Sequence, residues 1–180
     1  DSIHQLGCQT LINAGGLWAV AVAQAIKGLP QDDIPHVHYA KGAFFSLTGK
    51  SPFRHLIVPT QQWIRMGGIY TLDMALRARF GPEEEWIDNV NYDIDAARSS
   101  TIYEAARRYW PGLEDGMLQP AYTGIRPRLN GPGEPIADWI IHGPAEHGVP
   151  GLVNLYGIES PGITSSLPIS EMVTAMVEGL

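Results

Sequence analysis

The sequence contains a single cysteine, Cys8, among 180 residues. One thiol cannot close a disulfide within the chain, so we expect a reducing compartment and place the protein in the cytoplasm, with peripheral attachment to a membrane as the alternative. We interpret Cys8 itself as a small buried side chain beside a strand. No apolar run is long enough to cross a bilayer, so no transmembrane segment is expected.

Positive charge is also scarce, because 12 Lys and Arg stand against 19 Asp and Glu, a formal net charge of −7. Since neutralising phosphates needs a basic face, nucleic acid is not expected as a partner. Two histidine pairs, His36 with His38 and His142 with His147, lack a third ligand at zinc-site spacing, so no metal site is expected. What is present, 44% hydrophobic and 17% charged residues, is typical of a globular domain.

The apolar pattern changes along the chain and predicts an α+β fold. The expected strands are 10–13, 36–47, 55–60, 67–73, 75–80, 121–129, 137–143 and 152–157, and the expected helices are 17–27, 96–110 and 164–180. We interpret the acidic run Glu83–Glu85 as a solvated loop and Asp95 as the N-cap of the second helix. A mostly antiparallel sheet with a packed helix should form the middle of the chain, while the two ends join in another layer.

The segment GIESPGITSS, 157–166, joins an apolar strand to the last helix. Gly157 and Gly162 let the backbone pass close to a ligand, and the hydroxyls of Thr164 and Ser165 are available as N-caps. The start of a helix presents unpaired N–H groups and the positive end of its dipole, which suit an anionic or carbonyl-like ligand. Neither GxGxxG nor a phosphate-loop lysine is present, so a triphosphate is not expected. The residues alone leave open whether this turn binds a ligand or only packs.

Six segments of the chain together resemble one family. They are NAGGLWA (13–19), YAKGAFFSL (39–47), LRARFGPEEEW (76–86), RRYWPGL (107–113), YTGIRPRLNGPGEP (122–135) and GPAEHGVPGLVNLYGIESPGITSSL (143–167). They look like the C-terminal half of FAD-dependent oxidoreductases of the D-amino-acid oxidase-like family, in the branch that is similar to L-2-hydroxyglutarate dehydrogenases and oxidases. The resemblance implies a substrate-binding domain at 35–142, flanked by pieces 1–34 and 143–180 of an incomplete, Rossmann-like FAD-binding domain. The glycine-rich fingerprint that the family carries earlier is not in this sequence, so we expect a fragment that holds FAD weakly by itself.

The resemblance also implies which residues contact the cofactor. The turn at 157–164 would lie against the flavin ring, the turn at 13–16 would approach it from a second strand, and Lys41 with Gly42 would lead into the substrate sheet beside it. The implied cofactor-binding residues are Ala14, Gly15, Gly16, Lys41, Gly42, Gly157, Ile158, Glu159, Ser160, Pro161, Gly162, Ile163 and Thr164.

Two further residues are candidates for catalysis. Arg126, in GIRP, would grip the carboxylate of the substrate as the family's arginine does, because a planar guanidinium can bind a carboxylate through two parallel bonds. The alternative is a structural ion pair, and Arg128 on the same strand face is a weaker candidate. Tyr70 stands where relatives in this branch show a histidine. It would be a poorer base at neutral pH, and the alternative is an ordinary strand aromatic.

The function that the resemblance implies is oxidation of a small 2-hydroxy acid, such as L-2-hydroxyglutarate, by hydride transfer to FAD. The expected partners are this carboxylic acid, the missing N-terminal half of the same enzyme, and oxygen or a quinone as electron acceptor. The 180 residues alone are expected to be inactive. The alternatives are a flavoenzyme similar to amino-acid or glycerol-phosphate oxidases, and a cofactor-free binding module.

Overall fold

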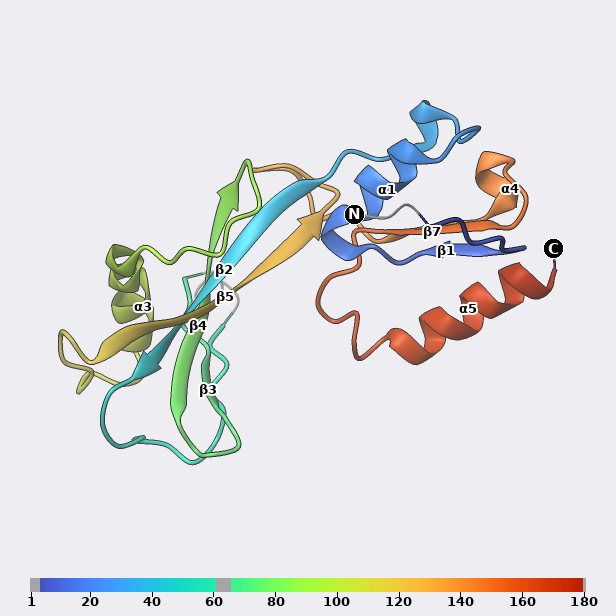
Figure 1. Cartoon of the computed structure of the whole chain (residues 1–180). Helices are drawn as coiled ribbons and strands as arrows, with labels where there is room; N and C mark the ends of the chain where they lie inside the picture. Colours follow the sequence, from blue (N-terminus) through green and yellow to red (C-terminus); the bar gives the residue numbers. More distant parts are fainter. Residues whose placement is uncertain (1–3, 61–65, 180) are drawn as a thin grey trace. The chain divides into compact units, whose positions relative to one another are not determined.

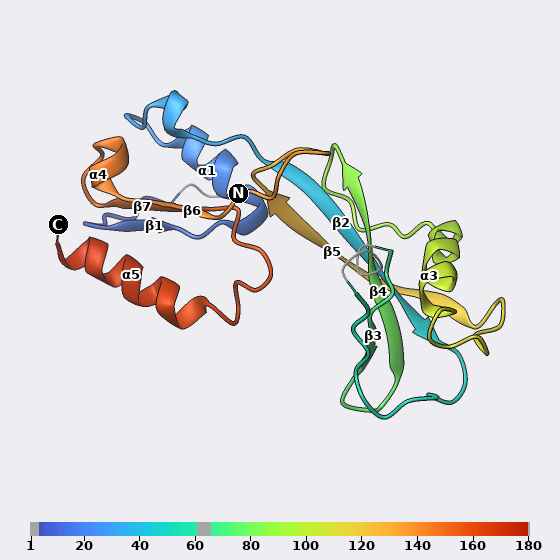
Figure 2. The same cartoon turned by 180° about the vertical axis from the view of Figure 1, so that it is seen from behind.

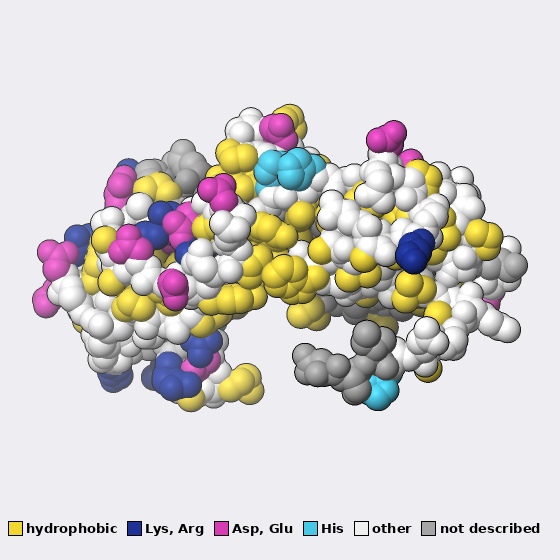
Figure 3. All heavy atoms as spheres, turned by 45° about the horizontal axis from the view of Figure 1, so that its top comes forward, with side chains coloured by type: hydrophobic (Ala, Val, Ile, Leu, Met, Phe, Trp, Pro, Cys, Tyr) yellow, Lys and Arg dark blue, Asp and Glu magenta, His cyan; other side chains and the backbone are white. Residues whose placement is uncertain are grey.

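The computed structural model describes residues 4–60 and 66–179, which divide into two compact units. Unit 1 combines residues 1–38 with 126–180, and unit 2 comprises residues 39–125 (Figures 1 and 2). The charges divide unevenly between them. Unit 1 has three Lys or Arg against nine Asp or Glu, a formal charge of −6, and unit 2 has nine against ten. In the view of Figure 3, the surface of unit 2 carries side chains of both signs. The face of unit 1 that is visible there carries few charged side chains.

Unit 1 is built on a three-stranded sheet in the order β1, β7, β6. Its strands are β1 (Leu11–Asn13), β6 (Ile140–His142) and β7 (Leu152–Tyr156). β1 runs parallel to β7, and β6 runs antiparallel to it. The helices of the unit are η1 (Gly16–Trp18), α1 (Ala19–Ala25), η2 (Gln31–Asp33), α4 (Pro144–His147) and α5 (Ser166–Glu178). The α1 and α5 helices lie on opposite faces of this sheet (Figures 1 and 2).

The central strand β7 is buried along its whole length because helices cover both of its faces. Leu152 and Tyr156 pack with Ala19 and Ala23 of α1, while Val153 and Leu155 pack with Val173 of α5. Successive side chains of a strand point to opposite faces, so the apolar run Leu152–Tyr156 supplies both layers of the core.

Unit 2 is built on a four-stranded sheet in the order β3, β4, β2, β5. The strands are β2 (His38–Leu47), β3 (Tyr70–Leu72), β4 (Ala78–Ile87) and β5 (Leu118–Arg128). β4 pairs antiparallel with both β2 and β3, with Lys41 opposite Glu85 and Tyr70 opposite Phe80. The helical segment η3 (Ala96–Arg98) and α3 (Ser99–Ala106) packs on β4. The core of the unit contains Phe45, Tyr70, Phe80 and Ile102.

The α+β architecture and the antiparallel middle sheet with its helix are as predicted, and so is the cap of that helix. Asp95 Oδ1 accepts a hydrogen bond of 2.9 Å from the N–H of Ala97. The helix ends at Ala106 rather than at 110. The strand expected within 137–143 does not belong to the middle sheet, because β6 pairs with β7. Unit 2 therefore ends at Ile125, well before the predicted domain boundary at 142.

Three other expectations were wrong. The run Glu83–Glu85 lies inside β4, and Glu83 is only 5% exposed, with its carboxylate bound by Arg98 at 2.5 Å. Residues 55–60 form no strand, and only Ile57 makes an isolated bridge, to Tyr70. Cys8 is exposed rather than buried. Most of the expected link at 61–66 lies outside the described residues. None of the helices within residues 4–60 and 66–179 is long and apolar enough to cross a membrane.

Candidate cofactor and substrate site

The two turns that the sequence assigns to the cofactor leave the sheet of unit 1 at the same edge. β1 and β7 are parallel and in register, with Asn13 opposite Asn154. The chain continues from β1 into residues 14–16 and from β7 into residues 157–164. In open α/β sheets, ligands bind outside the carboxyl ends of parallel strands, and both turns lie there.

The first turn is held by two buried asparagines. Asn13 Nδ2 donates to the carbonyl of Ala19 at 2.8 Å and to Asn154 Oδ1 at 2.9 Å, and Asn13 Oδ1 accepts from the N–H of Gly15 at 3.2 Å. Gly16 follows with a φ of +57°, a conformation that side chains disfavour. Asn154 is fully buried, and its Nδ2 has no hydrogen-bond partner within the described residues. The sequence reasoning missed this pair, although a single amide in each apolar strand, LIN and LVNLY, was a visible signal.

The second turn forms a cavity of about 560 Å³ at the start of α5. Seven of the eight predicted residues of this turn line it, Ile158 to Thr164, together with Ser166. The turn is closed by the N–H of Gly162, which donates to the carbonyl of Glu159 at 2.5 Å. A Cβ on Gly162 would lie 2.7 Å from that oxygen, so no other residue fits without moving the backbone. The expected hydroxyl cap is absent, because Ser165 occupies the N-cap of α5 without a side-chain hydrogen bond.

The two arginines of β5 both contact the carboxylate of Glu159. Arg126 Nη1 donates to Glu159 Oε2 at 2.7 Å, and Arg128 Nε lies 3.4 Å from Oε1, an ion pair too long for a good hydrogen bond. The side chains of Arg126 and Arg128 are 28% and 10% exposed. Two cations share one carboxylate, so the cluster has a net charge of +1. Apart from Lys27, these two are the only basic residues of unit 1, which is otherwise strongly acidic.

Lys41 and Gly42 have structural contacts within unit 2. The Lys41 ammonium lies 2.8 Å from Glu85 Oε1 and donates to Asn91 Oδ1 at 3.0 Å and to the carbonyl of Asp93 at 2.9 Å. A Cβ on Gly42 would lie 2.8 Å from Cβ of Pro82. These contacts account for both residues without a ligand, so their assignment to the cofactor depends on the resemblance alone.

Tyr70 lies in the core of unit 2 with no exposed surface. Its ring meets those of Phe53 and Phe80 edge to face, each with a centroid distance of 5.3 Å. Its hydroxyl hydrogen bonds with Ser51 and donates to the carbonyl of Phe53 at 3.2 Å. A catalytic base must reach the proton that it removes, so this geometry supports the alternative of an ordinary strand aromatic.

The comparisons with known proteins bear on the family and the fold of the chain. The family model described as FAD dependent oxidoreductase (DAO) matches residues 2–176. The chain belongs to this family. The family predicted from the sequence is thereby confirmed, and its members depend on FAD. That residues 14–16 and 157–164 contact the flavin stays a prediction; of these, Ile158 to Thr164 line the cavity at the start of α5.

One curated protein and one solved structure are similar to nearly the whole chain. The chain is 42% identical over 175 residues to "L-2-hydroxyglutarate dehydrogenase, mitochondrial" of Arabidopsis thaliana, covering 91% of this chain and 36% of that protein. A solved structure of dithionite-reduced L-α-glycerophosphate oxidase from Mycoplasma pneumoniae with FAD bound matches with a TM-score of 0.72 at 18% identity. That match covers 94% of this chain and 42% of the oxidase, and it shows a shared fold. The chain thus spans about a third of the length of its curated relative.

Proposed function

We propose that this chain forms the substrate-binding part, and one side of the flavin site, of an FAD-dependent oxidoreductase that oxidises a small 2-hydroxy acid. The observation that supports this most is Arg126, whose side chain is 28% exposed and is held by Glu159 of the cavity-forming turn, in a unit with few other cations. The 42% identity to a protein named for L-2-hydroxyglutarate supports that acid as the substrate.

Bound FAD would supply the acceptor for the hydride that leaves the substrate carbon. The residues of this chain bind and orient. Glu159 engages one nitrogen of Arg126, and the remaining N–H groups of the guanidinium can hold the substrate carboxylate, which fixes the direction of the adjacent C–H bond. The N-terminal end of α5, beside the cavity, favours negative charge on whatever lies there.

Replacing Arg126 with lysine in the full-length protein tests this role. One ammonium cannot reproduce two parallel bonds to a carboxylate, so about 2–4 kcal/mol of binding and orientation should be lost. We expect KM for the hydroxy acid to rise and kcat/KM to fall by roughly 10- to 1000-fold, while flavin content is unchanged.

Arg128→Lys is the matched control, because Arg128 lies on the same strand and contacts the same carboxylate but is nearly buried. It should reduce kcat/KM far less. Wild-type turnover by Arg126→Lys, or a loss that follows flavin release or unfolding, would show that Arg126 is structural.

The same assay separates the alternatives. A panel of 2-hydroxy acids, amino acids and glycerol phosphate distinguishes the substrate classes, and an absorbance spectrum without flavin would favour a cofactor-free binding module. The proposal also includes oxygen or a quinone as the electron acceptor, a preceding half of the enzyme as partner, and a cytoplasmic location. The curated relative is named as mitochondrial.

A further inference from the structure

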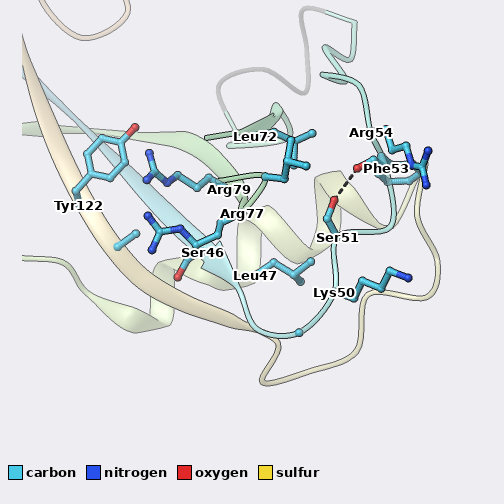
Figure 4. A pocket seen from close by; sticks show the side chains of 13 residues that line it. Ser46, Leu47, Lys50, Ser51, Phe53, Arg54, Leu72, Arg77, Arg79 and Tyr122 are labelled. Carbon is cyan, nitrogen blue, oxygen red and sulfur yellow. Dashed lines mark hydrogen bonds between the residues drawn. The ribbon is translucent and has the colours of Figure 1, made fainter. Parts of the chain in front are cut away.

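A second cavity, of about 910 Å³, lies entirely within unit 2 and has no part in the function proposed above. Residues of β2, β3, β4 and β5 line it, together with the segment 49–54 and the turn between β3 and β4 (Figure 4). Its volume is in the range of small-molecule sites, which are mostly apolar with a few convergent polar groups.

The charge of this cavity is opposite to that of the chain. Four of the thirteen residues that line it are basic and none is acidic, although the chain has a formal charge of −7. The basic residues are Lys50, Arg54, Arg77 and Arg79. A hollow lined by one sign of charge concentrates the opposite ion, so this cavity favours an anionic ligand.

Asp73, which is not among the lining residues, orients two of these cations. Its Oδ1 accepts from the N–H groups of Ala75 and Arg77 at 2.9 Å each, and its Oδ2 accepts from Arg77 Nε at 2.8 Å and Arg79 Nη2 at 3.1 Å. The hydrogen bond from the backbone of Arg77, with the others, holds the pKa of Asp73 below its usual value against the opposing effect of desolvation. One carboxylate thus fixes two guanidiniums and leaves the pair with a net charge of +1.

The turn that presents Arg77 has an unusual backbone. Leu76 has a φ of +59° although it is not a glycine, a conformation that costs about 1–2 kcal/mol. Its side chain is 70% exposed and lines the cavity rather than the core. This φ belongs to the short turn in which the N–H of Leu76 donates to the carbonyl of Asp73 at 2.8 Å and the N–H of Asp73 to that of Arg77 at 3.0 Å. Arg77, the next residue, lines the same cavity as Arg79.

Basic side chains lie on two opposite sides of the cavity. In Figure 4, Arg77 and Arg79 extend toward Tyr122 and Ser46, while Lys50 and Arg54 extend to the opposite side. The guanidinium carbon of Arg79 lies 5.4 Å from the centroid of the Tyr122 ring. This contact, with the bond to Asp73, restrains Arg79 before any ligand arrives.

We propose that this cavity is a binding site for a small organic anion. Arg77 and Arg79 hold its carboxylate or phosphate, and its apolar body lies against Leu47 and Leu72. None of the residues that line the cavity is among those assigned to flavin or substrate.

Calorimetric titration of the full-length protein tests this site with three probes, octanoate, octyl phosphate and inorganic phosphate. Octanoate or octyl phosphate should bind at least about tenfold more tightly than inorganic phosphate, since only these two also bury an apolar body. The tighter of the two identifies the preferred head group. Arg79→Gln should weaken this binding by about tenfold or more. Arg77→Gln, at a side chain 74% exposed and therefore safe for folding, should weaken it by about threefold or more.

Two controls keep the result specific. Lys27→Gln removes an exposed charge in unit 1, and Arg126→Lys perturbs the proposed hydroxy-acid site, so binding of the alkyl probe should change by less than about twofold in both. The proposal is overturned if neither alkyl probe saturates, if inorganic phosphate binds equally well, or if both Arg77→Gln and Arg79→Gln bind like wild type. A loss of binding in Arg126→Lys would equally overturn it, by placing the probe in the hydroxy-acid site.

Discussion

Replacing Lys41 with methionine tests whether this residue serves the cofactor, as the resemblance implies, or the sheet. The ammonium has three N–H groups, and the structure gives it three partners, Glu85, Asn91 and Asp93. No donor remains for a flavin. Methionine keeps the unbranched apolar stem in place, so the substitution removes the charge and its bonds with little change in volume.

The expected cost follows from what each partner retains. Glu85 lies directly opposite Lys41 on β4 and is 24% exposed, and it keeps a second ion pair with Arg98 Nη1 at 3.1 Å. Asn91 and Asp93 are exposed residues, so water can replace the lost donor. The loss should therefore lie below the 3–5 kcal/mol of a fully buried broken pair, and we expect about 2 kcal/mol in the free energy of unfolding. With an m-value of roughly 1–3 kcal/mol/M, the urea midpoint should fall by about 1 M.

The assay measures urea unfolding and the flavin content of the folded full-length protein side by side. Lys27→Met is the matched control, because Lys27 is exposed and its replacement should leave both quantities unchanged. If Lys41→Met unfolds at the wild-type urea concentration but loses flavin, the structural reasoning is refuted and Lys41 is a cofactor ligand.

Two further predictions concern unit 1. Glu159→Gln should lower kcat for the hydroxy acid by about three- to tenfold, because Arg126 loses the charge that orients it. KM should not rise, because the positive charge of Arg126 and Arg128 is then no longer offset. A raised KM at unchanged kcat would contradict this role. Burial, and then the charge of Asp33, raise the pKa of Tyr156 to about 12. The folded pKa lies above the ordinary value near 10, because the folded protein favours the neutral phenol of Tyr156. The contribution of this neutral side chain to the free energy of unfolding is therefore complete below about pH 10 and is lost as the pH rises toward 12. Urea unfolding of Tyr156→Phe at pH 8 and pH 11 should show a smaller alkaline loss than wild type, and Tyr92→Phe, at an exposed tyrosine, should behave like wild type.

The sequence predicted those features whose cause is local. Asp95 caps its helix because a carboxylate two residues before an N–H is a short-range arrangement. The apolar run Leu152–Tyr156 became a strand because residues buried on both faces need no alternation. The resemblance supplied the family and the position of the 157–164 turn, which composition alone left undecided.

The features that the sequence did not reveal depend on partners far along the chain. Glu83–Glu85 looked like a solvated loop because the arginine that binds Glu83 and Glu85 is Arg98, 15 residues beyond Glu83. The segment 137–143 was assigned to the middle sheet because the strand that pairs with β6 follows it in the chain, after α4. The buried roles of Lys41 and Tyr70 likewise follow from contacts across the sheet and with the segment before β3. Periodicity identifies an element, but it does not identify the neighbour that buries it.

The buried amides explain how two turns so distant in sequence come to share one sheet edge. Asn13 and Asn154 lie 141 residues apart and are opposite one another in the parallel pairing of β1 and β7. A slip of one residue would set Asn13 opposite Val153 or Leu155, leaving a buried amide without its partner at a cost of about 1–3 kcal/mol. Apolar residues at both positions would pack equally well in several registers. The amide pair therefore selects the register that aligns residues 14–16 with residues 157–164, and Asn13 Oδ1 then holds the N–H of Gly15 in the first of these turns.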